Sequence, residues 1–307
     1  METVRTPRVV TLAPLMALSA GAIWSFGTVL ARVADQSDAF QYLIWRSVGI
    51  IAIVELWALC TGRPQSTLRA FTSGRRMLAA NVALLLASIG FVYAVKTTSA
   101  ANAAFLGSTT PLFGVIVARL FLGEKILVRT YLAIAIAFVG LVIMVAGDLQ
   151  VGDFADNIVG DVAALASAAG FAFYAAIVRS APERDWSPVL PGYGVLMIVI
   201  CATVTIADSN TLVPPAPDIG LALVHGAVFI VGGTLIFNIA SRSIPASAMT
   251  VFAQTEMVLV PVWAFLLLSE RPTSSTLVGG TIIVIAVVGM AVLDARQSPP
   301  TEVLTAV

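Results

Sequence analysis

Charged residues are scarce in this chain. They make up 11% of its 307 residues, whereas about 25% of an ordinary soluble domain is charged. Apolar residues reach 59%, and the mean hydropathy is +0.97. So few charges would not keep a globule of this size in solution, and we expect an integral membrane protein. The formal net charge is zero, which gives no basic field that would attract a nucleic acid.

Histidine and cysteine are almost absent as well. His225 is the single histidine, so a metal site with several histidines is excluded. Cys60 and Cys201 lie in separate apolar runs and show neither metal-binding nor redox spacing. Phosphate-binding loops, Walker sequences and nucleophile elbows do not occur either. We therefore expect no bound metal, no cofactor and no ATP-driven step carried by this chain.

Ten apolar runs are each long enough to span a bilayer, which takes roughly 17–25 helical residues. Runs of this length predict helices and not barrel strands. Arg5 and Arg8 precede the first run in the manner of a signal peptide, but that run is long enough to span and is followed by similar ones, so we expect a retained helix. The runs are 12–31, 39–60, 77–95, 99–121, 127–146, 158–179, 188–208, 218–238, 245–267 and 274–293.

The sequence repeats itself after about 147 residues. Leu18–Arg32 resembles Leu165–Arg179, and Leu122-Gly123-Glu124 resembles Leu268-Ser269-Glu270. Each copy holds five predicted spans, and because five is odd the two copies must be inverted relative to each other. Inverted repeats are a recurring architecture of secondary transporters. We expect an all-α integral membrane protein with ten transmembrane helices in two inverted five-helix repeats.

Lysine and arginine predict the orientation. With the N-terminus in the cytoplasm, 12 of the 17 Lys and Arg residues fall on the inside, and only Arg32, Lys96 and Arg271 fall in outside loops. Cytoplasmic loops of membrane proteins carry such an excess. We therefore expect an inner-membrane protein with both termini in the cytoplasm. The expected parts are the repeats 12–148 and 158–294 and the cytoplasmic tails 1–11 and 295–307.

These residues also resemble a known family. The resemblance is carried in the first copy by Trp45-Arg46-Ser47, Thr98-Ser99-Ala100-Ala101-Asn102-Ala103-Ala104, Pro111 and Leu122-Gly123-Glu124-Lys125, and in the second by Ile244-Pro245-Ala246-Ser247-Ala248, Pro261 and Leu268-Ser269-Glu270-Arg271. Over about residues 12–293 the chain looks like the paired EamA domains of the drug/metabolite transporter superfamily. The resemblance implies ten helices, a cavity between the halves and transport of small metabolites. Amino acids, related metabolites, organic cations and vitamins are all implied as substrates, and import and export both stay open.

Glu256 is the sharpest candidate for a functional residue. It falls within the ninth predicted span, and its counterpart in the first copy is Thr110. A charge at the bilayer centre costs about 2.5–3.5 kcal/mol on insertion scales, so such residues usually face a cavity, a partner or an ion path. Glu256 is therefore a candidate counter-charge for the substrate or a candidate proton carrier. The alternative is a structural pair, with Arg46 or with neighbouring hydroxyl groups.

Six further residues complete the predicted site. Arg46 can clamp a carboxylate or reach the membrane interface with its long stem. His225 can titrate near neutral pH, or be a core histidine. Asn102 lies on a small-residue face and either packs or lines the cavity. The remaining three are the aromatic residues Trp24, Phe171 and Tyr174.

The two aromatic pairs occupy mirrored positions in the first helix of each copy. Trp24 and Phe26 in the first copy correspond to Phe171 and Phe173 in the second. They form either the walls of a cavity at the repeat interface or ordinary core and lipid contacts. Pro111 and Pro261, in turn, lie in the corresponding fourth and ninth spans and are expected to kink them.

Together these patterns predict a secondary active transporter that works by alternating access and is not an enzyme. One helix bundle would rock against its inverted mate, with protons as the candidate coupling ion. The expected partners are a small-molecule substrate and the lipid bilayer, and the chain is expected to be a monomer or a homodimer. The alternative is an intramembrane enzyme acting on a lipid-linked substrate, but the titratable groups within the spans are few and scattered.

Overall fold

The computed structural model of the chain describes residues 7–62, 65–122, 128–148, 154–181, 183–240 and 255–297. Every regular element in these ranges is a helix. The first half contains α1 (Pro7–Val33), α2 (Ala39–Cys60), α3 (Ser66–Thr72), α4 (Arg75–Thr97), α5 (Ala100–Gly107), α6 (Thr110–Leu122) and α7 (Val128–Asp148). The second half contains α8 (Phe154–Arg179), α9 (Val189–Ala207), α10 (Ala216–Val224), the π-helix η1 (His225–Ile230), α11 (Val231–Ala240), α13 (Thr255–Leu268) and α14 (Ser274–Gln297).

These helices have the length and composition of a multi-pass membrane protein. Within the described ranges, seven are long and apolar enough to cross a bilayer, and three shorter apolar helices accompany them. Large apolar side chains point outward from the bundle, among them Leu59 at 70%, Leu120 at 72% and Val128 at 75% exposure. Such a surface suits lipid and not water. The expected all-helical membrane class is therefore confirmed.

The fourth predicted span, 99–121, is two helices and not one. The break lies at Ser108 and Thr109, between α5 and α6 and directly before Pro111. Proline has no N–H to give to the carbonyl four residues earlier, and here the Thr110 hydroxyl donates to the Gly107 carbonyl instead, at 2.8 Å. The expected distortion at Pro111 is thus present. At Pro261 α13 runs on without a break.

The eighth predicted span contains a feature that the sequence gives no sign of. Between α10 and α11 the backbone forms one stretch of π-helix, His225–Ile230. Single π-helical segments within longer helices are uncommon and are often found at functional sites. Here the segment carries His225, which was predicted to belong to the site.

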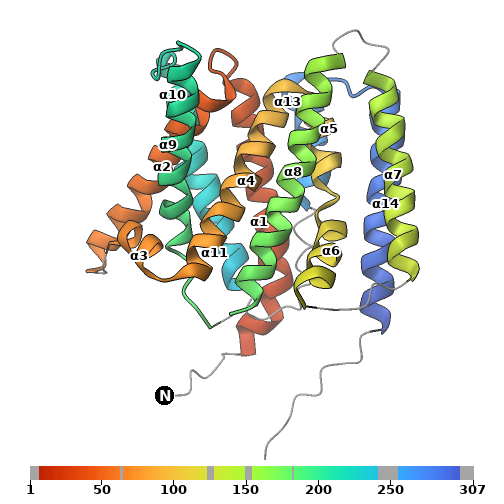
Figure 1. Cartoon of the computed structure of the whole chain (residues 1–307), viewed down its shortest axis with the longest axis horizontal. Helices are drawn as coiled ribbons and strands as arrows, with labels where there is room; N and C mark the ends of the chain where they lie inside the picture. Colours follow the sequence, from red (N-terminus) through yellow and green to blue (C-terminus); the bar gives the residue numbers. More distant parts are fainter. Residues whose placement is uncertain are drawn as a thin grey trace, which may run out of the picture.

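The loops gather at two opposite ends of the bundle (Figure 1). At one end, which we call the Arg32 end, the Lys96 ammonium donates to the Ser37 carbonyl at 2.7 Å, and the Ser37 amide donates to Asp218 at 2.8 Å. The indole of Trp45 donates to the carbonyl of Leu212 at 3.0 Å. All of these belong to loops or helix ends that the charge pattern predicts to lie outside.

At the other end, which we call the Asp185 end, the predicted inside loops meet. Arg69 of the short helix α3 forms an ion pair with Asp185 at 3.0 Å. Although partial burial raises the pKa of Asp185, hydrogen bonds from Ser187 and Arg69 outweigh that effect and lower it. The guanidinium of Arg184 donates to the carbonyl of Ser73. Helix α3 itself was not expected.

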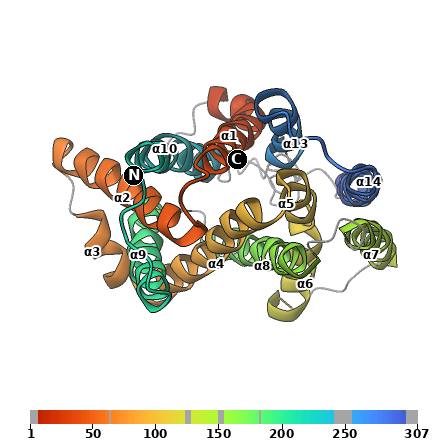
Figure 2. The same ribbon diagram turned by 90° about the horizontal axis from the view of Figure 1, so that it is seen from above.

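Helices of the two sequence copies pack closely against one another. α4 lies along α8 and α7 along α14, as Figures 1 and 2 show, while α1 packs on α11 and α13, and α2 on α9. Glycines permit the closest approaches. A β-carbon at Gly90 would overlap the carbonyl of Ala163 in α8, and one at Gly170 would lie 2.7 Å from the amide of Ala87 in α4.

Between α7 and α14 the glycine contact is reciprocal. A β-carbon at Gly140 would lie 2.5 Å from the carbonyl oxygen of Gly279, and one at Gly279 would overlap the carbonyl oxygen of Gly140. Seen from above, this helix pair stands at the edge of the bundle (Figure 2). Neither helix contributes a residue to the cavity described next.

Candidate substrate cavity

A cavity of about 110 Å³ lies among the central helices. Its lining comes from α1, α2, α4, α5, α6, α8, α9, η1, α11 and α13, and therefore from both sequence copies. The residues that line it include Trp24, Thr28, Arg46, Ser88, Phe91, Thr110, Ser167, Phe171, Tyr174, Tyr193, His225, Thr234, Glu256 and Met257. Ligand pockets commonly measure about 300–1,000 Å³, so a substrate of that size requires this cavity to widen.

Six of the seven predicted site residues line this cavity. They are Trp24, Arg46, Phe171, Tyr174, His225 and Glu256. The structure thus brings together side chains from α1, α2, α8, η1 and α13 that the sequence spreads over more than 200 positions. Their roles in binding or coupling remain predictions.

Asn102 is the exception, because it lies outside the cavity. It is buried, with 2% exposure. The amide group of Asn102 donates to the Thr98 hydroxyl at 3.4 Å and accepts from the Thr276 hydroxyl at 2.7 Å. It therefore ties α5 to the preceding loop and to α14, in agreement with the packing interpretation.

Aromatic rings of both sequence copies line the cavity and meet across it. The rings of Trp24 and Phe171 meet edge to face, with centroids 5.9 Å apart, and the Tyr174 ring lies 5.9 Å from that of Phe171. Trp24 and Phe171 occupy equivalent positions of the two copies. Their predicted companions turn away from the cavity: Phe26 stacks on Trp263 at 4.6 Å, and Phe173 is 36% exposed.

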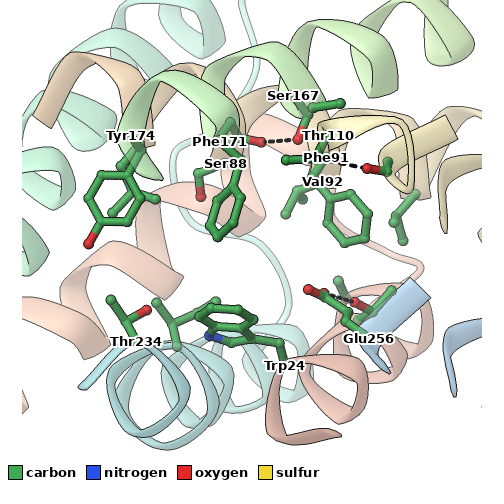
Figure 3. Close-up of a pocket in the computed structure, with 18 of the residues that line it drawn as sticks. Trp24, Ser88, Phe91, Val92, Thr110, Ser167, Phe171, Tyr174, Thr234 and Glu256 are labelled. Carbon is green, nitrogen blue, oxygen red and sulfur yellow. Dashed lines mark hydrogen bonds between the residues drawn. The ribbon is translucent and has the colours of Figure 1, made fainter. Parts of the chain in front are cut away.

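Glu256 projects into the cavity from the first turn of α13. Its carboxylate accepts one long hydrogen bond, of 3.5 Å, from the Thr28 hydroxyl. Figure 3 shows it on the same wall as Trp24, opposite Ser88 and Phe171. Thr110, its counterpart in the first copy, also lines the cavity. Residues 245–254 of the predicted ninth span lie outside the described residues.

Arg46 is the largest charged group inside the bundle. Its side chain is 2% exposed and lines the cavity from α2. The guanidinium donates through Nη2 to the hydroxyl of Ser88 in α4, and its Nε has no hydrogen-bond partner within the described part of the chain. Of the two predicted alternatives, the inward position suits a group that clamps a carboxylate in the cavity, and that role stays a prediction.

His225 closes the cavity on the side of α2. Its Nδ1 lies 2.9 Å from the hydroxyl of Tyr42. The Lys96 ammonium also contacts Tyr42 and lies 5.0 Å from the centre of its ring. The histidine is buried and hydrogen-bonded, as expected of a core histidine, and a coupling role through its titration stays a prediction.

Several lining residues were not predicted, namely Thr28, Ser88, Tyr193 and Thr234. Each is an uncharged polar residue in an apolar helix, and such residues are common at helix contacts in membrane proteins. Spacing gives a partial signal for Tyr193, which lies 147 residues after Arg46 and therefore at the equivalent position of the second copy. Nothing in the sequence distinguishes Ser88 or Thr234.

A second cavity, of about 370 Å³, lies at the Arg32 end and is lined by Arg32, Asp35, Asp38 and Lys96 among others. Ala31 lines both cavities. Next to it, the Arg32 guanidinium donates to the Val95 carbonyl at 2.7 Å and to Glu270 at 3.2 Å. Glu270 in turn accepts from the amide of Ala100 at 2.9 Å. These bonds join α1, α4, α5 and the segment after α13 between the two cavities.

Breaking this junction should open the central cavity toward the Arg32 end. In a variant with Cys60 and Cys201 replaced by Ser, a Cys introduced at Thr28 should react several-fold faster with a water-soluble maleimide once Glu270→Gln is added. Arg69→Gln, which removes the ion pair at the opposite end, is the matched control and should leave the rate unchanged. Equal rates in the Glu270→Gln and control proteins would contradict the inference that the junction of Arg32 and Glu270 closes the central cavity toward the Arg32 end.

An apolar helical bundle of this kind is a multi-pass membrane protein, and its central cavity is lined by an arginine and a glutamate among apolar and hydroxyl groups. The model of the EamA-like transporter family matches residues 11–146 and 158–292. The chain therefore belongs to this family, as the resemblance predicted, and it is a membrane transport protein.

Two named relatives are similar over about two thirds of their length. The pseudopaline exporter CntI of Pseudomonas aeruginosa is 24% identical over 66% of this chain and 69% of its own. The S-adenosylmethionine uptake transporter of Rickettsia felis is 24% identical over 63% of this chain and 64% of its own. A solved crystal structure shares the fold, with a TM-score of 0.65 and 17% identity over 94% of this chain and 98% of that one.

Proposed function

We propose that the chain is a secondary active transporter that moves a small metabolite across the inner membrane by alternating access, with protons as the candidate coupling ion. One observation carries the proposal. The central cavity is built by both sequence copies, and the equivalent residues Trp24 and Phe171 meet within it. Transporters built from repeats bind their substrates at such an interface, near the bilayer midplane.

The pairing of helices supports ten spans in two inverted copies, 12–148 and 158–294. α4 packs on α8, and the counterpart of that contact is α11 on α1. Likewise α5 and α6 pack on α8, as α13 packs on α1, while α2 and α9, and α7 and α14, are counterparts that pair with each other. A twofold relation between the copies produces this pattern, and five spans per copy place its axis in the membrane plane.

The charge distribution supports the proposed orientation. Arg69, Arg75, Arg76 and Arg184 belong to the Asp185 end, and an excess of arginine marks the cytoplasmic side. In this orientation both termini are cytoplasmic and the Arg32 end faces outward. The junction of Arg32 and Glu270 then closes the outer end of the central cavity.

The relatives support a small organic substrate but leave the direction open. One is named as an exporter and the other as an uptake transporter. Both are named as transporters, which speaks for transport over an intramembrane enzyme. Within the described ranges no group of three or more His, Cys, Asp or Glu residues is placed to hold a metal ion.

Reconstitution into liposomes tests the proposal. With an imposed pH gradient and a panel of amino acids, betaines, polyamines and vitamins, we expect saturable flux of at least one solute. We also expect accumulation above equilibrium, which a protonophore should abolish. Protein-free liposomes are the control. If correctly folded protein carries no solute of the panel in either direction, the proposed function is contradicted.

A further inference from the structure

The buried guanidinium of Arg46 is short of partners. One of its nitrogens donates to Ser88, its Nε has no acceptor among the described residues, and the residue is 2% exposed. Two ion pairs occur within the described ranges, Arg32 with Glu270 and Arg69 with Asp185, and neither includes Arg46. A buried cation that faces a cavity is therefore left without a counter-charge by the part of the chain that the structure describes.

Such a group needs an anion. Arginine stays protonated at any physiological pH, and taking an ion out of water costs several kcal/mol unless a partner compensates it. The planar guanidinium matches a carboxylate with two parallel hydrogen bonds. Because the cavity is the open side of Arg46, the anion that fits best is one that enters the cavity.

Glu256 offers the opposite charge on the opposite wall. In Figure 3 it lies beside Trp24, whereas Ser88, which holds Arg46, lies with Phe171 and Tyr174 across the cavity. Within the described part of the chain, its carboxylate accepts the 3.5 Å bond from the Thr28 hydroxyl. Trp24 and Phe171 belong to opposite walls and their rings meet across the cavity, and aromatic faces also attract cations.

We propose that the substrate is a zwitterion: one molecule with an anionic group for Arg46 and a cationic group for Glu256. The apolar part between the two groups packs on Trp24 and Phe171. This assignment rests on the proposed transport function and narrows it, because a purely cationic solute leaves the Arg46 charge unpaired and a purely anionic solute leaves the Glu256 carboxyl group without a cationic partner. Such an unpaired charge inside the membrane disfavours binding.

Ligand binding to the purified full chain tests this assignment. The probes are the common amino acids and glycine betaine, and for each amino acid its methyl ester, which keeps only the cation, and its N-acetyl derivative, which keeps only the anion. Binding is read as an increase in the thermal midpoint. At least one zwitterion should bind, and both of its derivatives should bind at least tenfold more weakly, since each loses a charge-assisted interaction.

Variants assign each charge to its partner. Arg46→Gln should weaken the zwitterion about tenfold to hundredfold and should not weaken the methyl ester, because it removes the group that this derivative leaves unpaired. By the same reasoning, Glu256→Gln should weaken the zwitterion and should not weaken the N-acetyl derivative. Arg75→Gln, an exposed arginine at the start of α4, is the matched control. If the Arg46→Gln protein fails to fold, Arg46→Lys replaces it in the test. Lysine keeps the positive charge but lacks the planar guanidinium, so this variant should still weaken binding of the zwitterion.

The outcomes separate this inference from the proposed function. Methyl esters that bind as tightly as their zwitterions, or no binding by any zwitterion of the panel, would overturn the inference. Unchanged zwitterion affinity in the Arg46→Gln protein would do so too. In each case flux of any other solute in liposomes would leave the transport function standing. Absence of all flux by folded protein would instead remove the function itself.

Discussion

Replacing Glu256 with Gln is expected to abolish gradient-driven accumulation of the substrate, with a loss of about a hundredfold or more. Glu256 is the carboxylate that faces the central cavity, and its contact with Thr28 is long. A side chain in this position either pairs with the substrate cation or carries a proton through the cycle. Glutamine keeps the shape and removes both abilities.

Two transport assays distinguish those roles. If Glu256 carries the coupling proton, the variant should still exchange substrate down its gradient in counterflow, although it no longer accumulates substrate. If Glu256 binds the substrate cation, counterflow should fall as well at a fixed low substrate concentration. The zwitterion assignment requires the second result.

Glu55→Gln is the matched control for this substitution. Glu55 is a carboxylate of α2 that accepts hydrogen bonds of 2.6 Å from the backbone and the hydroxyl of Thr67, and it does not line the cavity. Its loss should leave both transport assays near their wild-type values. Normal accumulation by the Glu256→Gln protein at every pH would contradict any functional role of Glu256.

Gly226→Ala is expected to prevent stable folding. A β-carbon at this position would overlap the carbonyl oxygen of Arg46 and would lie 3.1 Å from the amide nitrogen of Ile50. Both atoms belong to the backbone of α2, which cannot move aside as the end of a side chain can. Overpacking a well-filled interior typically costs about 1–3 kcal/mol, and a clash with a backbone carbonyl belongs at or above the upper end of that range.

Two other glycines of the eighth predicted span are the matched controls. Gly220 and Gly232 lie on either side of Gly226, and a β-carbon at either one meets no atom within 4 Å. Alanine there should be neutral or slightly stabilising, since alanine favours a helix over glycine by up to about 1 kcal/mol. The readouts are the yield of monodisperse protein and its thermal midpoint. A Gly226→Ala protein as stable as Gly232→Ala would show that α2 and η1 are not held in this contact.

The positions of the helices could be predicted from the sequence because each apolar run must satisfy its own backbone. The predicted spans 39–60 and 274–293 coincide with or fall within single helices, α2 and α14. The break near Pro111 was also predictable, because proline removes a specific hydrogen bond. The π-helical segment at His225 was not, since no proline lies within it to mark the change in hydrogen bonding.

The residues of the candidate site also divide into those that the sequence could predict and those that it could not. Glu256 and Arg46 stood out because a charge in an apolar run is costly wherever it points. Ser88 and Thr28 did not, because a single hydroxyl in a membrane helix costs little, and their importance comes from what they face in another helix. Asn102 was grouped with the site for its polarity, yet its amide is used to join α5 to Thr276, a partner 174 positions away in the sequence.

The glycine contacts between α4 and α8 and between α7 and α14 have a consequence for how this chain can be divided. Each contact joins one helix before residue 149 to one after it, and each leaves no room for a side chain between the two backbones. The boundary between the sequence copies is therefore not a boundary between bodies. A chain that contained only one copy would expose to lipid the helix surfaces that pack on the other copy in the full chain. We therefore expect that neither copy moves as a separate body and that any rocking takes place between bundles that each combine helices of both copies.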